Sequence, residues 1–168
     1  MFRDLARCTA RLKGERYEGA VIAAAEWSRK GNGQPLAEDA MPDILCDRHG
    51  MMTVQAADDS GMLTIKMLLG RKLPKVRTAR TDETLRLEAT AEGVAATSIR
   101  LRFTAEDVRS FVSDVNDTNA LHEGGNPLVP GLLIMERVLR DRALIACPYL
   151  LMKFTIPVFV SQEVVVSL

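Results

Sequence analysis

Short apolar or alternating stretches, separated by turn-forming residues, run through the first hundred residues and predict a series of β-strands. Residues 63–69 form one such stretch, directly after the turn-forming residues at 58–61. Residues 84–103 contain two more, on either side of Glu92-Gly93. Because this dipeptide favours a turn, residues 84–103 are predicted to form a β-hairpin.

Two N-terminal segments have less regular patterns. Residues 3–27 are compatible with a hairpin that turns at Lys13-Gly14 or with a helix, and the pattern favours strands. Residues 28–45 are rich in Gly, Pro and polar side chains, so a long loop with room for one helical turn is expected there.

Helical spacing begins at Thr104. This residue suits the N-cap of a helix, and Asp107 occupies the acidic position of a capping box. Apolar residues then recur at helical intervals, at Val108, Phe111 and Val112. A helix is therefore predicted from Thr104 to about Val115, followed by a polar loop over residues 116–126.

A second, largely buried helix is predicted after this loop. Pro130-Gly131 introduces a run that is apolar on most sides, and the predicted helix spans about residues 131–146, ending before Pro148. Residues 149–160 and 163–168 are expected to form two strands that finish the chain.

Composition and charge narrow the classes of function. The 168 residues are 47% hydrophobic and 26% charged, which is ordinary for a globular protein with a substantial core. Lys and Arg together number 22, and Asp and Glu together also number 22, so the formal net charge is zero. Neither nucleic acid nor a membrane surface is therefore an expected partner. No stretch reaches the roughly 20 apolar residues of a membrane-spanning helix. Three cysteines predict reduced thiols and a cytoplasmic location, and Cys46 with His49 supplies too few ligands for zinc.

The polar loop and the start of the buried helix bring together groups suited to proton transfer. Asp117 and His122 share the loop, and a carboxylate beside an imidazole is the usual means of moving protons near neutral pH. Gly131, after Pro130, opens the helix, so its N–H can stabilise negative charge on a carbonyl oxygen. Glu136 lies among apolar residues, where an unpaired carboxylate is costly.

Each of these side chains also has an ordinary structural explanation. Asp117 and Asn119 are common in turns, and His122 can lie on the surface. Glu136 can face solvent beside an arginine of its own helix. The combination at close spacing is what favours catalysis.

The run from Phe111 to His122, FVSDVNDTNALH, resembles the hydratase motif of the MaoC-like enoyl hydratases. That motif has an aromatic residue and then Gly-Asp-x-Asn-Pro-aliphatic-His. The positions that match without a gap are Asp117, Asn119, Leu121 and His122. Asn116 stands in place of the motif's Gly, and Ala120 in place of its Pro.

The next stretch resembles the 3-hydroxyacyl-carrier-protein dehydratases. Their pattern is His-x-x-Gly-x-Pro-x-x-Pro-Gly, followed by an acid five residues later. This sequence matches every position, with His122, Gly125, Pro127, Pro130, Gly131 and Glu136. Lys153-Phe154 and Pro157-Val158 fit the strand that follows, whereas Ser161-Gln162 replaces a Gly-Asp.

Both resemblances imply an α+β hot-dog fold, in which a curved antiparallel sheet wraps a long central helix. Residues 104–168 would form the catalytic segment, and residues 1–103 would complete or precede it. In both families further strands follow the one that holds Pro157, but this sequence ends at Leu168. Three arrangements stay open: a permuted hot dog whose N-terminal strands fill the vacant positions, a degenerate double hot dog, and a C-terminally truncated chain.

The resemblances further imply a hydro-lyase, which dehydrates 3-hydroxyacyl thioesters or hydrates enoyl thioesters. They imply a homodimer without metal or resident cofactor, whose substrate arrives on coenzyme A or on the phosphopantetheine of an acyl carrier protein. Thioester hydrolysis and non-catalytic acyl binding on the same scaffold are the alternatives.

The resemblances also assign roles to residues. His122 would be the base at C2 or hold the leaving hydroxyl. Either Asp117 or Glu136 would be the acid, and Asp117 is favoured because it shares the loop of His122. The substrate-binding positions would be Asn119, Gly125, Pro130 and Gly131.

Overall fold

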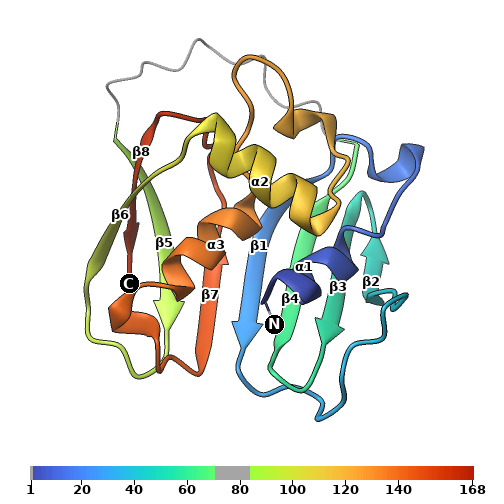
Figure 1. Ribbon diagram of the computed structural model, residues 1–168, viewed down its shortest axis with the longest axis horizontal. Helices are drawn as coiled ribbons and strands as arrows, with labels where there is room; N and C mark the ends of the chain where they lie inside the picture. The colour runs from blue at the N-terminus through green and yellow to red at the C-terminus, as the bar shows by residue number, and fades with distance from the viewer. Residues whose placement is uncertain (1, 71–83) are drawn as a thin grey trace.

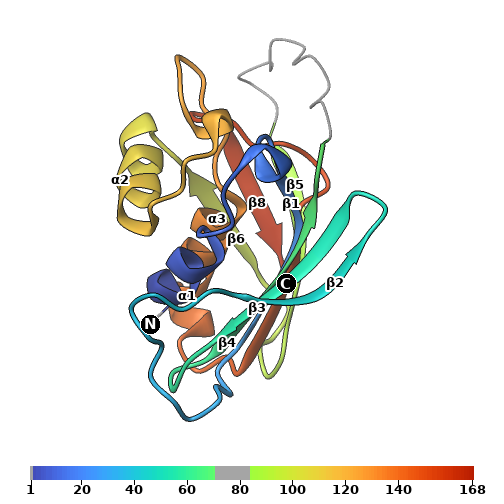
Figure 2. The same ribbon diagram turned by 90° about the vertical axis from the view of Figure 1, so that its right-hand side faces the viewer.

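The computed structural model describes residues 2–70 and 84–168, which form an α+β structure (Figure 1). Helices α1 (Phe2–Thr9), α2 (Ala105–Val115) and α3 (Gly131–Leu139) lie on one side of a sheet (Figure 2). The strands are β1 (Val21–Ser28), β2 (Asp43–Arg48), β3 (Met51–Ala57), β4 (Met62–Leu68), β5 (Leu85–Ala91), β6 (Ser98–Arg102), β7 (Tyr149–Lys153) and β8 (Glu163–Ser167). Short 3-10 helices are η1 (Glu15–Tyr17), η2 (Ala120–His122) and η3 (Arg142–Leu144).

The strands form one eight-stranded open sheet in the order β2-β3-β4-β1-β7-β5-β8-β6. Its pairings are antiparallel except that of β5 with β8, which is parallel. β7 and β8, which follow α3 in the sequence, lie between strands that precede it. Strands from residues 1–103 and 104–168 therefore share one sheet and alternate from β1 to β6, and β8 is an interior strand.

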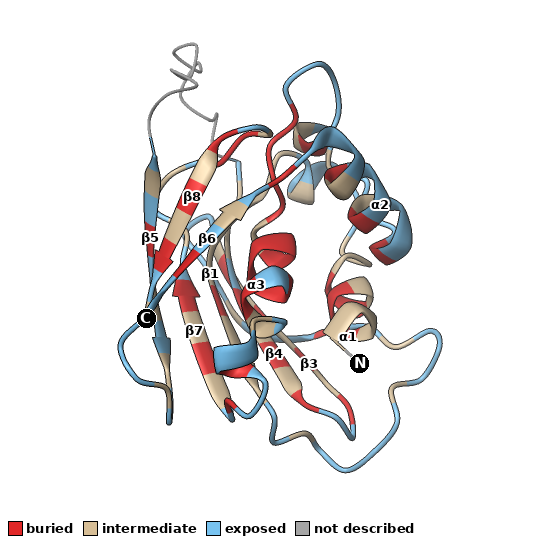
Figure 3. Cartoon of the chain, turned by 60° about the vertical axis from the view of Figure 1, so that its left-hand side comes forward, coloured by how far each residue is buried: buried red, intermediate tan, exposed pale blue. Residues whose placement is uncertain are grey.

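The core lies between this sheet and the helices, where the buried residues gather (Figure 3). Successive side chains of a strand point to opposite faces, so every second residue of an interior strand meets the helices. In β7 and β8 these residues are fully buried, namely Leu150, Met152, Val164 and Val166.

The strand patterns of residues 63–69 and 84–103 are confirmed, but one predicted pairing is wrong. β4 matches the first range, and β5 and β6 lie within the second. These two strands do not form a hairpin, because β8 lies between them and pairs with both. Period-two alternation specifies which face of a strand is buried, and it leaves the neighbouring strand undetermined.

The strand prediction for residues 3–27 is wrong at its start. Phe2–Thr9 is the helix α1, and strand structure begins only with β1. Its buried residues are Leu5, Ala6, Cys8 and Thr9. Their spacing is helical, but over eight residues it is too short to decide against strands from the sequence alone. The loop predicted over residues 28–45 is confirmed from Arg29 to Pro42, because Ser28 ends β1 and Asp43 begins β2.

The helix predicted after Thr104 is confirmed, together with its capping box. The Thr104 N–H donates to Asp107 Oδ2 at 2.9 Å, and the Asp107 N–H donates to Thr104 Oγ1 at 3.1 Å. Arg137 of α3 also pairs with Asp107, so the cap joins the two helices. The hydrogen bond from the Thr104 backbone is the main cause that holds the pKa of Asp107 below its ordinary value.

We expect Asp107→Asn to be about 1 kcal/mol less stable than the wild type at neutral pH. Because the folded pKa of Asp107 is lowered, its carboxylate contributes stability above its ordinary pKa of about 4. That stability is lost as the pH falls through the folded pKa. Urea unfolding at neutral and at acidic pH should therefore show that the difference in unfolding free energy between the wild type and Asp107→Asn becomes smaller on acidification. Glu106→Gln, at the exposed neighbouring position, is the control, and a difference that stays constant with pH would contradict the prediction.

Helix α3 begins at Gly131, as predicted, but ends at Leu139 and not near residue 146. The cause lies two residues further on. Asp141 has an extended backbone, and its side chain accepts the N–H of Ala143 at 3.0 Å, which starts η3. An aspartate that bonds the nearby backbone competes with continuation of the helix.

The predicted strand over residues 149–160 is also shorter than expected. β7 ends at Lys153, and Phe159 forms only an isolated bridge with Leu128. β8 agrees with the strand predicted over 163–168. Within residues 2–70 and 84–168, no helix has the length and apolar character needed to cross a membrane.

Candidate active site

The end of α2 positions the loop that carries Asp117 and His122. Asn116 caps the helix in the left-handed conformation, with φ 56° and ψ 40°. Asn adopts this conformation more readily than most residues with a side chain. The Asp117 N–H then donates to the carbonyl of Val112 at 3.0 Å, which closes the turn. Asn116 is therefore compatible with this turn at the position where the hydratase motif has Gly.

Asn119 holds the loop in place with both ends of its amide. Its Nδ2 donates to the carbonyl of Ala20 at 2.8 Å, and its Oδ1 accepts the N–H of Leu121 at 3.2 Å. The Asn119 N–H in turn donates to Asp117 Oδ1 at 2.9 Å. Asn119 thus joins the loop to the segment before β1, and Asp117 Oδ2 is the oxygen turned to His122.

His122 is buried, and one of its ring nitrogens is fixed by the backbone. Nδ1 lies 2.7 Å from the carbonyl oxygen of Leu128. Because a carbonyl can only accept, Nδ1 carries the proton, and in the neutral ring Nε2 carries the lone pair. Nε2 lies 3.5 Å from Asp117 Oδ2. The bond to the Leu128 carbonyl therefore fixes the ring of His122 so that Nε2 faces the carboxylate of Asp117.

A cavity of about 570 Å³ adjoins this pair. Of the residues predicted for the site, its wall contains Asp117, Asn119, His122, Pro130 and Gly131. Most of the remaining wall is apolar and comes from α1, β1, β4, α2, α3 and the segment after β7. A pocket of this size with a mostly apolar wall suits a mainly apolar ligand.

Gly131 places the start of α3 on the cavity wall. The amides of Leu133 and Ile134 donate to the carbonyl of Pro130, at 3.0 and 3.2 Å, so Gly131 precedes the first intrahelical bonds. A Cβ at Gly131 would lie 3.2–3.3 Å from the ring of Phe154, which also lines the cavity. Glycine therefore lets Phe154 pack directly against the helix start.

Two predicted site residues lie away from the cavity. Gly125 is in an exposed loop and is not part of the wall. Glu136 is buried within α3 and does not line the cavity either. The structure therefore brings Asp117, His122 and Gly131 together and leaves Gly125 and Glu136 outside.

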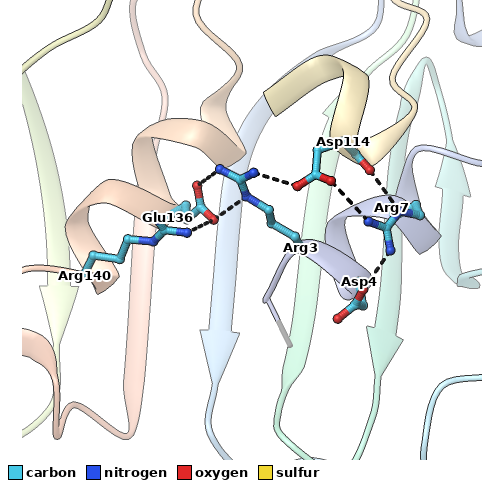
Figure 4. Close-up of polar contacts among 6 residues, drawn as sticks. All are labelled: Arg3, Asp4, Arg7, Asp114, Glu136 and Arg140. Atoms are coloured by element: carbon cyan, nitrogen blue, oxygen red, sulfur yellow. Dashed lines mark hydrogen bonds and ion pairs between the residues drawn. The ribbon is translucent and has the colours of Figure 1, made fainter. Parts of the chain in front are cut away.

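Glu136 is bound by two arginines (Figure 4). Arg3 of α1 donates from Nε to Oε1 at 2.7 Å and from Nη2 to Oε2 at 2.9 Å. Arg140 donates from Nη2 to Oε1 at 2.8 Å. This arrangement satisfies a carboxylate that is only 4% exposed. The expectation of a neighbouring arginine is met by Arg140, but the carboxylate is buried and does not face solvent.

Arg3 connects all three helices. Besides Glu136 of α3, it donates from Nη1 to Asp114 Oδ2 of α2 at 2.6 Å, and its guanidinium lies 5.5 Å from the centre of the Phe111 ring. The bonds to Glu136 and Asp114 raise the pKa of Arg3 above its ordinary value. The sequence around Arg3 gives no signal of this role, because the partners of Arg3 are more than one hundred positions away.

The sequence also did not predict that α1 and the segment after it line the cavity. This part of the wall includes Ala6, Thr9, Ala10, Leu12 and Tyr17. A strand prediction for residues 3–27 places none of them beside the loop of His122. No local pattern in the sequence marks these residues as part of a site, because none of them belongs to a recognisable motif.

The chain was compared with protein-family models, with curated proteins and with solved structures, and it matches none of them. In the part of the chain that the structure describes, no group of three or more His, Cys, Asp or Glu is arranged to hold a metal ion. The chemistry that the arrangement supports is proton transfer between a ligand and the pair of His122 and Asp117. The start of α3 offers a place for an oxygen that gains negative charge.

Proposed function

We propose that this chain is a hydro-lyase of acyl thioesters, which dehydrates 3-hydroxyacyl groups or hydrates enoyl groups. The orientation of His122 is the main support. Its Nδ1 is held by Leu128, and its Nε2 lies 3.5 Å from Asp117 on the wall of a mostly apolar cavity. The start of α3 at Gly131 lies on the same wall. The reaction requires a base, an acid and a site for developing negative charge, and these groups can supply all three.

In dehydration, the thioester carbonyl would lie at the start of α3, within reach of the Gly131 N–H. His122 Nε2 takes the proton from C2, and the helix start stabilises the negative charge that develops on the carbonyl oxygen. The bond between C3 and its hydroxyl then breaks, and the hydroxyl leaves as water with a proton from Asp117 Oδ2. Proton return from His122 to Asp117, across 3.5 Å, restores the site. Hydration follows the same steps in reverse.

Asp117 is preferred to Glu136 as the acid in this scheme. Asp117 Oδ1 is occupied by the Asn119 N–H, while Oδ2 faces the cavity-lining His122. Both oxygens of Glu136 accept from arginines, and Glu136 is not in the cavity wall. Asn119 serves to position the loop, and the exposed location of Gly125 gives no support to a substrate-binding role.

The same resemblance concerns the architecture of the chain and the carrier of its substrate. We favour a permuted hot dog, because β7 and β8 are flanked by N-terminal strands, which would fill the positions that the resembling families fill from the C-terminus. The acyl group would arrive on coenzyme A or on the phosphopantetheine of a carrier protein, without a resident cofactor. A homodimer remains the expectation from the resemblance, and a cytoplasmic location remains the expectation from the three cysteines.

The same site allows two other functions. A carboxylate such as Asp117 could activate water for attack on the thioester carbonyl, which would make the chain a thioesterase. The cavity could also hold an acyl chain without reaction. Both alternatives leave the carbon–carbon double bond of an enoyl thioester intact, so one assay separates them from hydration.

The test is to incubate the wild-type protein with enoyl thioesters, from crotonyl to dodecenoyl, both of coenzyme A and of a phosphopantetheine-bearing acyl carrier protein. We expect loss of the absorbance of the conjugated double bond without release of free thiol. Thiol release would indicate a thioesterase. Neither change at any chain length, with the protein folded, would reject the hydro-lyase and favour acyl binding.

A further inference from the structure

The wall of the cavity contains both exposed and fully buried residues. Lys13, Gly14 and Glu18 belong to its wall and are exposed to solvent, so a large carrier can reach the cavity there. Other wall residues lie in the protein core, each at most 1% exposed. These are Ala6, Ile65, Phe111 and Ile134.

The four buried wall residues come from four separate elements. Ala6 comes from α1, Ile65 from β4, Phe111 from α2 and Ile134 from α3. Among these four side chains, that of Ala6 is by far the smallest. α1 lies in front of β3 and β4 (Figure 1), and its residues Ala6 and Thr9 belong to the cavity wall.

Polar bonds and core packing both hold α1 in its position. Arg3 anchors its first turn to Glu136 and Asp114, as Figure 4 shows. Arg7 adds a bond from its Nε to the carbonyl of Asp114 at 2.9 Å. On the inner face, Leu5 is fully buried. The space beside this helix is therefore set by the size of its inward side chains.

We infer that Ala6 determines specificity, by limiting the length of the acyl chain that the cavity accepts. This inference rests on the proposed function. With the reacting carbons between His122 and Gly131 and the carrier at the exposed wall residues, the acyl tail would extend toward the buried ones, which include Ala6. A larger side chain at position 6 removes space from the tail and leaves His122 and Asp117 untouched, so it should lower activity on long chains selectively.

The experiment is a series at one position: Ala6→Gly, Ala6→Val and Ala6→Leu. For each variant, kcat/KM is measured with crotonyl, octenoyl and dodecenoyl thioesters. We expect the ratio of dodecenoyl to crotonyl activity to rise with Gly and to fall with Val and Leu, by about tenfold or more for Leu. Ala143→Leu makes the same chemical change at an exposed position outside the cavity wall and should leave the ratio unchanged.

Binding of saturated fatty acids, from butyric to palmitic acid, is measured by calorimetry on the same variants. This separates the inference from the proposed function. An inactive wild type whose variants still shift the preferred fatty acid would support the role of Ala6 and reject the hydro-lyase. An active wild type with unchanged length profiles across the series would overturn the inference and leave the hydro-lyase in place. Ala6→Gly and Ala6→Val keep the test decisive if Ala6→Leu does not fold.

Discussion

His122→Asn is expected to lose about a thousandfold in the rate of enoyl-thioester hydration while the protein stays folded. The side-chain amide of Asn can place an N–H where His122 has Nδ1, so the bond to the carbonyl of Leu128 can persist. The variant has no group at the position of Nε2, which is the proposed base. Steady-state hydration of crotonyl-coenzyme A, together with circular dichroism, measures both effects.

His122→Ala and a change at His49 complete this experiment. His122→Ala also removes the base, but it leaves the buried carbonyl of Leu128 without its donor, so a further cost of about 1–3 kcal/mol in unfolding free energy is expected. His49 is exposed and has a left-handed backbone (φ 52°), so His49→Asn keeps that backbone accessible and should be fully active. Full activity of His122→Asn would show that the base lies elsewhere.

Arg3→Ala is expected to lower the free energy of unfolding by about 3 kcal/mol. It removes two hydrogen bonds from Glu136, whose side chain is 4% exposed, and leaves that carboxylate with Arg140 alone. Arg140→Ala is the matched control. The Arg140 side chain is 63% exposed and donates one of the bonds, so its loss should cost about 1 kcal/mol or less. Urea unfolding at neutral pH measures both values.

Two further variants distinguish a structural role of Glu136 and its arginines from a catalytic role. In Arg3→Ala/Glu136→Leu both partners are gone, so part of the lost stability should return. Glu136→Gln should keep hydration activity within a few fold of the wild type, because Glu136 lies outside the cavity wall. A loss of activity in Glu136→Gln as large as in His122→Asn would restore Glu136 as the catalytic acid. An equal loss of unfolding free energy in Arg3→Ala and Arg140→Ala would contradict the role of Arg3 as the main partner of Glu136.

Features that depend on neighbouring residues could be predicted from the sequence. The capping box of Thr104 and Asp107 is complete within four positions, and the structure forms both of its bonds. Asp117 and His122 are five residues apart on one polar loop, so their proximity also followed from the chain. The alternating patterns located β4, β5 and β6 because side-chain direction along a strand is a local property.

Features that depend on distant partners were decided by the tertiary structure. The valine-rich C-terminal strand separates β5 from β6, since strand order depends on which apolar faces pack together and not on the turn between two strands. Glu136 matched the acid of a dehydratase motif, yet Arg3, far away in the sequence, turns it into the anchor of α1. The loop of Asp117 and His122 and most strands could therefore be located from the sequence alone, while long-range packing decided the strand order, the cavity and the position of Glu136 outside it.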